Sequence, residues 1–451
     1  MNALEWRVAA SLSAVYAVRM LGLFMILPVF ALYAHSLPHS TDFLAGLAIG
    51  IYGLTQAIFQ IPLGIASDRI GRKPVIIGGL LIFALGSLVA AFAQSIEMII
   101  VGRTLQGMGA IAAATMALAA DLTREENRSR VMAFIGMTIG LSFMVAIVVG
   151  PILYAKAGMS GIFWFAFSLA ICGILLVIFA VPTPLHIRAH RDAGILSDYL
   201  GKALKNTALL RMNAGVFALH FIMTANFLVI PTLFREKLNL PTLEHWKIYL
   251  PVFLIAFLGA IPLIIVAEKK QKIKPLLLAA ISLLMMAELL LAFGYQAAYS
   301  LLLAFSLFFL GFNFLEAIQP SLVAKYSAVE TKGTAMGIYN STQFLGIFAG
   351  GALGGWVNTH WQALGVFLLS ALVAGLWLLV SLRLPPPTFY TSRVIRLDGE
   401  NQDWEQIYQQ LKETPGVYEV EIVAKEQVAY LKVKKSELNE QALRAISGAS
   451  A

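Results

Sequence analysis

About twelve long apolar stretches recur along the 451 residues of the chain, and they constrain its fold more than any other feature. A helix needs roughly 18 or more apolar residues to cross about 30 Å of hydrocarbon, and soluble domains do not contain such runs in series. The stretches lie at 8–34, 43–66, 75–94, 96–120, 130–154, 161–181, 208–234, 247–267, 275–295, 299–323, 333–357 and 362–384. The sequence therefore predicts an all-α membrane protein with twelve transmembrane helices.

A longer polar segment at 182–207 divides the twelve stretches into two sets of six. It opens with Pro182 and Pro184 and carries basic residues, which is typical of a cytoplasmic linker. We expect one six-helix half at 1–181 and a second at 208–384. Apolar residues at helical spacing inside the linker predict a short amphipathic helix on the inner membrane surface. They are Ile195, Tyr199, Leu200 and Leu204.

After Arg383 the composition becomes that of a soluble domain. A stiff proline-rich linker is expected at 385–392, because proline runs favour an extended backbone. Within 393–451, alternating and helical spacing predict the order β-α-β-β-α, typical of a small α+β ferredoxin-like domain without its final strand. The predicted strands lie at 394–397, 418–422 and 428–433, and the helices at 404–411 and 438–446. Its excess of acidic residues disfavours nucleic acid as a partner, and its ligand is unknown.

The basic residues gather in alternate short loops, and their distribution is more informative than the net charge of +8. The opposite loops hold little beyond Lys156, Arg235, Lys237 and Lys247. Because Arg and Lys concentrate in cytoplasmic loops, we expect both termini in the cytoplasm. This one-sided distribution also argues against binding of nucleic acid by the membrane region.

The sequence offers little for redox, metal or nucleotide chemistry. Cys172 is the single cysteine and is expected to be buried in a span, so no disulfide framework is available. The Gly-x-x-x-x-Gly-Lys-Ser/Thr motif is missing, which disfavours direct use of ATP. We therefore expect no enzymatic activity, no cofactor and no metal site.

The charged turn between the second and third stretches carries the most specific motif. It runs from Gly64 to Lys73 and reads Gly-x-x-x-Asp-Arg-x-Gly-Arg-Lys. In spacing and in position it resembles the loop 2–3 signature of the major facilitator superfamily of secondary transporters, and the resemblance covers about residues 5–384. A weaker echo lies at 259–274, in the equivalent loop of the second half. Parallel pseudo-symmetric halves with a substrate site between them would produce such an echo.

The resemblance implies a conformational latch at the motif. Asp68, Arg72 and Asp121 would form a charge cluster that stabilises the outward-facing state, since an ion pair that exists in one of two states biases the equilibrium between them. The alternative is that these charges only set the topology of the loop. The predicted latch residues are Gly64, Asp68, Arg69, Gly71, Arg72, Lys73 and Asp121.

Two further patterns resemble those of the bacterial drug:proton antiporter branch of this superfamily. The first span contains Leu-Gly-x5-Pro-Val, with Gly22 and Pro28. The fifth span contains Gly140 and the pair Gly150-Pro151, although the second glycine pair of the antiporter motif is missing. The resemblance favours efflux, and it gives these residues a role in helix packing. Ordinary glycine-mediated packing without antiport is the alternative.

Proton coupling requires a group that changes charge within the membrane, where ionisable residues are functional by default. The first candidates are Glu316 in the tenth span, with Asn313 and Gln319 on the same helix face, and His220 in the seventh. Arg103 in the fourth span resembles an arginine that the family implicates in proton coupling. The alternatives are a hydrogen-bonded carboxylic acid, a core histidine and a packing arginine, respectively.

Polar and aromatic side chains of the central helices are the candidates for substrate binding. Large aromatic residues with few fixed charges suit an amphipathic or hydrophobic small molecule, because apolar pockets bind by area and shape. The candidates are Phe24, Tyr52, Gln56, Gln60, Asn226, Asn313, Tyr339, Asn340 and Gln343.

Together these features predict a proton-coupled secondary transporter of the bacterial inner membrane. We expect it to export amphipathic or hydrophobic small molecules by alternating access. Its expected partners are the substrate, protons and the lipid bilayer, and we expect a monomer. Two alternatives stay open at this point: a transporter-like sensor that signals through its C-terminal domain, and proton-coupled uptake of a nutrient.

Overall fold

The chain divides into two compact units, Met1–Pro385 and Pro386–Ala451. The first unit is a bundle of long helices, and the second is a small α+β domain. The computed structural model describes residues 1–183, 201, 203–327, 332–387, 391–397, 404–423, 428–434, 437–440 and 442–443.

The first half of the bundle begins with a broken helix. Helix α1 (Ala3–Phe24) stops two residues before α2 (Leu27–Ala34), and Pro28 at the start of α2 lacks the N–H that a continuous helix would use. The other helices of this half are α3 (Asp42–Ile70), α4 (Arg72–Ala91), α5 (Ile96–Met108), α6 (Ala112–Asp121), α7 (Glu125–Leu175) and the π-helical turn η1 (Leu176–Ala180).

The second half repeats this arrangement. Its first helix, α9 (Thr207–Lys237), starts at Asn206, whose side chain accepts hydrogen bonds from the backbone N–H groups of Ala208 and Leu209. The helices that follow are η2 (Thr242–Glu244), α10 (Trp246–Lys269), α11 (Ile273–Gly294), α12 (Ala298–Tyr326) and α13 (Lys332–Leu382).

Ten helical segments among the described residues are long and apolar enough to cross a membrane, and two of them contain two spans each. Helices α7 and α13 have 51 residues apiece. At 1.5 Å per residue each would measure about 77 Å, more than twice the thickness of the hydrocarbon. Each breaks where the backbone turns to positive φ, at Gly158 (67°) and Gln362 (54°). The predicted architecture of twelve transmembrane helices in two halves is confirmed.

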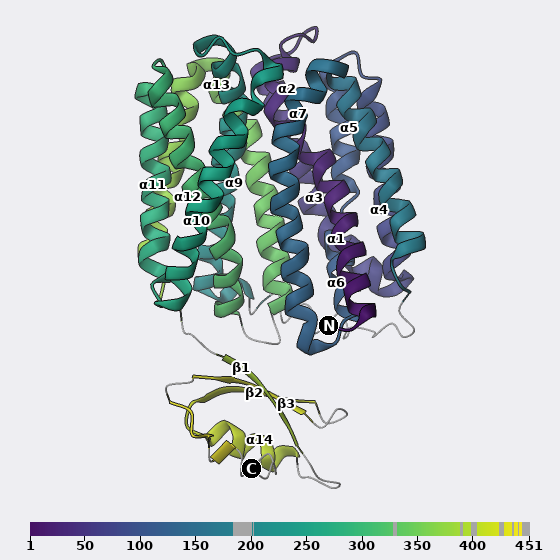
Figure 1. The fold of residues 1–451 in the computed structure, drawn as a ribbon, viewed down its shortest axis with the longest axis vertical. Coiled ribbons are helices and arrows are strands. Elements are labelled where there is room, and N and C mark those ends of the chain that lie inside the picture. The colour runs from purple at the N-terminus through teal and green to yellow at the C-terminus, as the bar shows by residue number, and fades with distance from the viewer. Residues whose placement is uncertain are drawn as a thin grey trace. The chain divides into compact units, whose positions relative to one another are not determined.

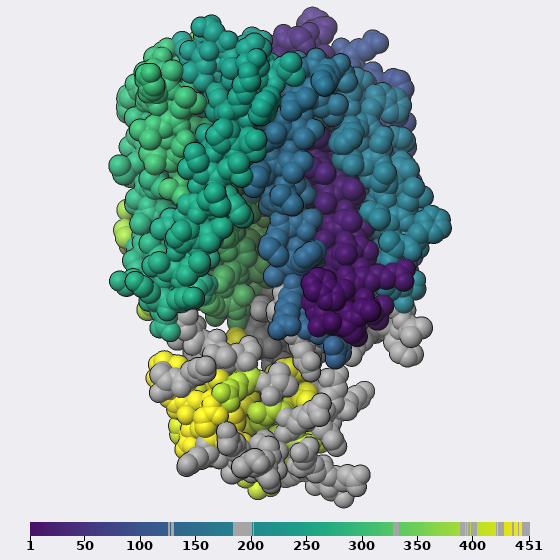
Figure 2. Space-filling view, viewed as in Figure 1, coloured from purple at the N-terminus to yellow at the C-terminus, as the bar shows by residue number. Residues whose placement is uncertain are grey.

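The two halves stand side by side, with α9–α12 on one side of the bundle in Figure 1 and α1 and α3–α6 on the other. Their surfaces meet in the upper part of Figure 2. A Cβ on Gly46 of α3 would overlap the carbonyl oxygen of Gly351 of α13, and one on Gly355 would overlap that of Asp42. Such close backbone approach requires small residues. The halves are therefore in direct contact at the end of the bundle that holds Asp42, opposite Arg72.

Two of the three glycines predicted to pack helices do so. A Cβ on Gly22 would lie 3.2 Å from the Cβ of Ala166, and one on Gly150 would lie 2.5 Å from the carbonyl oxygen of Met25. The prediction for Gly140 is wrong in this structure. A Cβ there would meet nothing within 4 Å, so Gly140 faces open space and brings no helices together.

The outer surface of the bundle is apolar, as expected where the surrounding lipid is as apolar as the core. Phe179 and Phe293 are 74% and 76% exposed on it. Cys172 also lies on this surface, so the expectation that it is buried is wrong. The apolar character of a span does not distinguish its lipid-facing side from its core-facing side.

The second unit contains β1 (Thr391–Arg396), α14 (Trp404–Glu413), β2 (Val417–Val423) and β3 (Val428–Val433). The sheet order is β1-β3-β2, and both outer strands pair antiparallel with β3. Strands β1 and β2 are thus parallel and separated by β3, as in a split βαβ unit. The core includes Leu411, Leu431 and Val433. The predicted small α+β ferredoxin-like domain is confirmed.

Two predicted helices lie partly outside the described residues. Ile195, Tyr199 and Leu200 of the linker helix are outside them, and Leu204 lies in a short helical stretch and is exposed. Ile446 of the last predicted helix is also outside, although residues 440 and 442–443 are helical.

Candidate functional site

The predicted charge cluster forms around Arg72. Its Nε lies 3.0 Å from Oδ2 of Asp121, its Nη1 donates to Oγ of Ser67 at 2.7 Å, and Asp68 also pairs with it. The side chains of Arg72 and Asp121 are each 3% exposed. Gly71 makes this geometry possible, because its φ of 101° lets α4 start one residue after α3 ends.

The other predicted latch residues contribute less to this cluster. Gly64 lies against α6, since a Cβ on it would be 3.2 Å from the Cβ of Ala113. Arg69 is exposed and Lys73 is half-buried, and neither forms an ion pair with a described residue. All members of the cluster belong to the first half, and the cluster is formed while the halves touch at the opposite end. It therefore does not require that end to be open.

Sequence reasoning missed a second ionic cluster beside the first. Glu5 is 1% exposed and accepts hydrogen bonds from Nε and Nη2 of Arg124 at 3.0 and 3.3 Å and from Nδ2 of Asn127 at 3.0 Å. It also forms a capping box with Asn2, which starts α1. The Asn-x-x-Glu spacing could have predicted the cap, but nothing in the local sequence indicates the contact with Arg124.

The second half contains a counterpart of the Arg72 cluster at the echo of the motif. Glu268, near the end of α10, accepts hydrogen bonds from Nζ of Lys325 at 2.7 Å and from Oγ of Ser321 at 2.8 Å, both on α12. The charges are exchanged between the halves. In the first half the cation, Arg72, follows the second span and the acid, Asp121, ends the fourth, whereas here the acid ends α10 and the cation ends α12. The side chains of Glu268 and Lys325 are 37% and 21% exposed, so this pair is better solvated than the first.

The predicted proton residues of the second half lie together. Nδ1 of His220 is 3.1 Å from the carbonyl oxygen of Val216, which can only accept, so Nδ1 carries the proton. In the neutral ring Nε2 is then an acceptor, and Nε2 of Gln343 donates to it at 2.7 Å. Oε2 of Glu316 lies 3.7 Å from the same imidazole nitrogen. Glu316 and His220 therefore lie within ion-pair distance of each other.

Glu316 is the more accessible member of the pair. Its side chain is 40% exposed on α12, whereas that of His220 is 5% exposed. Oε2 of Glu316 has no hydrogen-bond partner among the described residues. Asn313 and Gln319 lie three residues before and after Glu316 on α12, as expected, but Nδ2 of Asn313 and both amide atoms of Gln319 have no hydrogen-bond partner among the described residues. The polar neighbour of Glu316 is His220 of α9, which is itself bonded to Gln343 of α13.

Arg103 is not part of this group. It lies in the first half, 1% exposed, and donates to the carbonyl oxygens of Ala48 and Ile49 at 3.3 and 3.4 Å and to Oε1 of Gln106 at 2.8 Å. Its guanidinium also lies over the ring of Tyr52, 4.8 Å from the centroid. Two nitrogens of Arg103 thus bond to α3 and the third bonds to Gln106 on its own helix α5, and the structure does not bring Arg103 to Glu316.

The predicted substrate residues separate into two groups. Asn226 is occupied by another contact, because its Nδ2 donates to Oε1 of the fully buried Glu288 at 2.7 Å. The buried group comprises Tyr52, Gln56, Gln60, Asn226 and Tyr339. The partly exposed group comprises Phe24, Asn313, Asn340 and Gln343.

A cluster of aromatic rings crosses between the halves, and sequence reasoning identified only one of its members. Phe143 of α7 lies 5.0 Å from Phe24, 5.6 Å from Phe253 of α10 and 6.2 Å from Phe312 of α12, measured between ring centroids. Phe312 in turn lies 6.0 Å from the ring of His220. Periodicity could not separate these phenylalanines from the many that face lipid.

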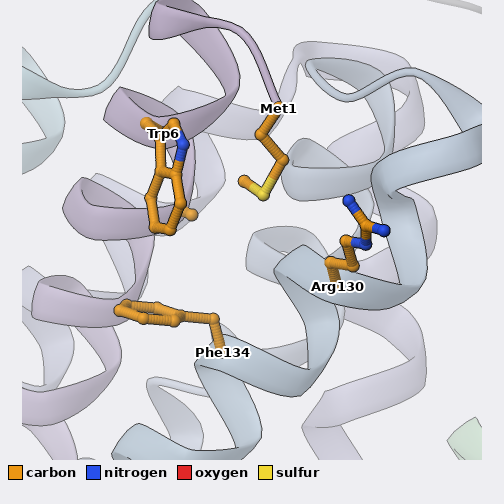
Figure 3. Close-up of a pocket in the computed structure, with 5 residues that line it drawn as sticks. Met1, Trp6, Arg130 and Phe134 are labelled. Carbon is orange, nitrogen blue, oxygen red and sulfur yellow. The ribbon is translucent and has the colours of Figure 1, made fainter.

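Two cavities lie away from these residues. One, of about 220 Å³, opens between α1 and α7 and is lined by Met1, Trp6, Ala9, Arg130 and Phe134 (Figure 3). The other, of about 740 Å³, lies at the opposite end and is lined by residues of both halves, including Tyr33, Tyr154 and Pro241. Neither contains a predicted site residue. No group of three or more His, Cys, Asp or Glu side chains suited to a metal ion occurs among the described residues.

Comparison with known sequences gives a consistent family. Residues 12–322 and 274–424 match the Major Facilitator Superfamily. The chain is 44% identical over 444 residues to the inner membrane transport protein YajR of Escherichia coli strain K12, covering 98% of both chains. It is 26% identical over 365 residues to the multidrug resistance protein MdtH of Aeromonas salmonicida strain A449, covering 79% of this chain and 88% of that protein.

Comparison with solved structures supports the same fold. A bacterial homologue of the human lysosomal transporter Spinster, in an inward-facing and occupied conformation, matches with a TM-score of 0.68. The match covers 85% of this chain and 96% of the homologue, at 11% sequence identity. At this identity the match concerns the fold alone.

Proposed function

Because the chain belongs to the major facilitator superfamily, we propose that this membrane transporter couples proton movement to the export of amphipathic or hydrophobic small molecules by alternating access. The observation that carries the proposal is the pairing of Glu316 with His220 at 3.7 Å inside the membrane unit. Ionisable side chains within a membrane bundle cost free energy, so their presence there indicates a function. Transport itself follows from the family, whereas the proton, the substrate and the direction of transport belong to the proposal.

In the proposed cycle the proton binds at the Glu316–His220 pair. A protonated Glu316 is neutral and can donate to the lone pair of His220 Nε2, while a protonated His220 can donate to the Glu316 carboxylate. The side-chain amide of Gln343 presents either a donor or an acceptor, so it can serve both states. The proton would reach the pair through Glu316, whose side chain is 40% exposed in the isolated structure.

The substrate would bind beside this pair, against the aromatic cluster of Phe24, Phe143, Phe253 and Phe312. These rings come from both halves, so a relative movement of the halves would change the contacts of a molecule held between them. Aromatic surface with few fixed charges suits amphipathic molecules. The distant similarity to a multidrug resistance protein supports export of such molecules.

The remaining assignments complete the proposal. We assign the Arg72 cluster to holding the ends of α3, α4 and α6 together as one moving body, and Gly22, Pro28 and Gly150 to helix packing. Both termini would be cytoplasmic, following the distribution of basic residues. The chain would act as a monomer, and the C-terminal domain would serve as a regulatory or interaction module.

Proteoliposomes with an imposed pH gradient test the proposal. We expect lipophilic small molecules to trigger proton movement, reported by an interior pH dye, in the wild type and not in Glu316→Gln. Glu288→Gln is the matched control, because it removes the other carboxyl group of the second half's spans, away from His220. Proton movement that survives Glu316→Gln would refute the assignment of the coupling site.

A further inference from the structure

Arg19 is a buried cation that is only partly satisfied. It lies on α1 and is 0% exposed. Its Nη2 donates to the hydroxyl of Tyr52 at 3.0 Å, to Oε1 of Gln56 at 2.5 Å and to the carbonyl oxygen of Gly109 at 3.1 Å. Its Nε and Nη1 have no hydrogen-bond partner among the described residues. A guanidinium has five N–H donors and stays protonated in proteins, so this arrangement leaves donors of a full positive charge unused.

The contrast with Arg103 shows that such an arrangement is not general in this half. Arg103 is equally buried, but each of its three nitrogens has an acceptor. The two arginines share Tyr52, whose hydroxyl contacts Arg19 and whose ring lies beneath Arg103. One of the two cations is therefore built into the scaffold, and the other retains free donors.

The first half provides no negative charge for Arg19. Its spans contain no Asp or Glu within 8–34, 43–66, 75–94, 98–120, 131–154 or 161–181. The acids nearest to Arg19 in sequence, Glu5 and Asp42, lie at the ends of helices α1 and α3, and Glu5 is bonded to Arg124. A buried charge that lacks a counter-charge destabilises a protein. The presence of Arg19 therefore calls for a functional explanation.

Arg19 lies close to the boundary between the halves. Its partner Tyr52 contacts Phe344 of α13, with ring centroids 6.3 Å apart. The residue before Phe344 is Gln343, which bonds His220. A movement of α13 away from α3 would thus uncover the neighbourhood of Arg19 and act on the His220 pair at the same time.

We infer that Arg19 binds the negatively charged group of the transported molecule, so the substrate class is an amphipathic organic anion such as an aromatic carboxylate. The free donors of the guanidinium would bind the anion, and the neighbouring rings of Tyr52 and Phe344 would bind its apolar part. Charge-assisted hydrogen bonds of this kind are stronger than neutral ones. This inference rests on the proposed transport function and specifies its substrate.

Three fluorescent probes separate the contribution of charge to binding from that of apolar area. They are 2-naphthoate, 2-naphthamide and 2-naphthylmethylamine, which share the naphthalene ring and are anionic, neutral and cationic, respectively. Binding to the full-length protein in detergent is measured by fluorescence titration. We expect the wild type to bind 2-naphthoate at least about tenfold more tightly than the other two probes, as loss of a hydrogen bond to a charged group implies. Arg19→Gln should lose this preference, and Arg19→Lys should keep much of it.

The same variants in proteoliposomes distinguish this inference from the proposed function. Charge preference that depends on Arg19, without any proton movement, would support the anion site and refute proton coupling. Proton movement triggered equally by all three probes and unaffected by Arg19→Gln would refute the anion site and leave proton coupling intact. Failure of 2-naphthoate to bind the folded wild type, or equal binding by folded Arg19→Gln, would also overturn the inference. Thermal unfolding of each variant shows whether it is folded.

Discussion

The two halves share a helical plan, but the ionisable side chains within their spans differ. In their interiors, the spans of the first half contain Arg19 and Arg103 and no carboxylate, whereas those of the second half contain Glu288 and Glu316 and no Arg or Lys. Arg19, Arg103 and Glu288 are at most 1% exposed. An arginine remains charged at any physiological pH, while a carboxyl group can gain and lose a proton. This difference fits the two proposed roles: a fixed positive charge in the first half binds the substrate anion, and a titratable group in the second half binds the proton.

The ionic clusters at the Arg72 end of the bundle show a second difference between the halves. Arg72 and Asp121 are almost completely buried, and Glu268 and Lys325 are partly exposed. Burial decides how much an ion pair matters, because breaking a buried pair leaves an uncompensated charge, whereas water replaces an exposed partner. Equivalent positions in the two halves should therefore respond very differently to the same substitution.

The largest effect is expected for Arg72→Ala. This change leaves Asp121 buried without its cation, and we expect the free energy of unfolding to fall by about 3–5 kcal/mol. Thermal and denaturant unfolding in detergent would measure it. Arg72→Lys is the control, since it keeps the charge and loses the fork geometry that reaches Asp121 and Ser67 together. Stability equal to that of the wild type in Arg72→Ala would show that the cluster contributes nothing to holding the first half together.

The contact between the halves is tested by Gly351→Ala. The added methyl group would overlap the carbonyl oxygen of Gly46, and we expect the state in which the halves touch to be destabilised by about 1–3 kcal/mol. Spin labels on the Asp42 end of each half should report a longer separation. Gly337→Ala lies on the same helix, where a Cβ meets nothing within 4 Å, and serves as the matched control. An unchanged distance distribution in Gly351→Ala would contradict the role of the glycine contact.

Glu288 tests whether a buried carboxyl group is needed for its charge or for its hydrogen bond. Glu288→Ala leaves Nδ2 of Asn226 without its acceptor, which should cost about 1–3 kcal/mol of unfolding free energy. Glu288→Gln retains an acceptor oxygen at the same place, so we expect its stability to approach that of the wild type. A Gln variant as unstable as the Ala variant would indicate that Asn226 requires an ionised carboxylate.

The sequence predicted what depends on composition and local spacing, and it missed what depends on packing. The twelve spans, the strand at 428–433 and the pairing of Arg72 with Asp121 follow from hydropathy, alternation and a motif, respectively. The contact of Glu5 with Arg124 joins residues 119 positions apart, and the aromatic cluster selects Phe143 from many similar residues. Gly140 and Cys172 were misplaced because the apolar composition of a span does not show which of its residues pack against another helix.

The smallest effect is expected for Lys325→Ala, and its comparison with Arg72→Ala sharpens the difference between the halves. Glu268 would keep its hydrogen bond from Ser321 and is 37% exposed, so water can replace the lost ammonium group. We expect a change in unfolding free energy of about 0–1 kcal/mol, measured under the same conditions as for Arg72→Ala. High salt should reduce this change further, because exposed pairs are screened more than buried ones. A loss of unfolding free energy as large as that of Arg72→Ala would mean that the two clusters stabilise their halves equally in spite of their different burial.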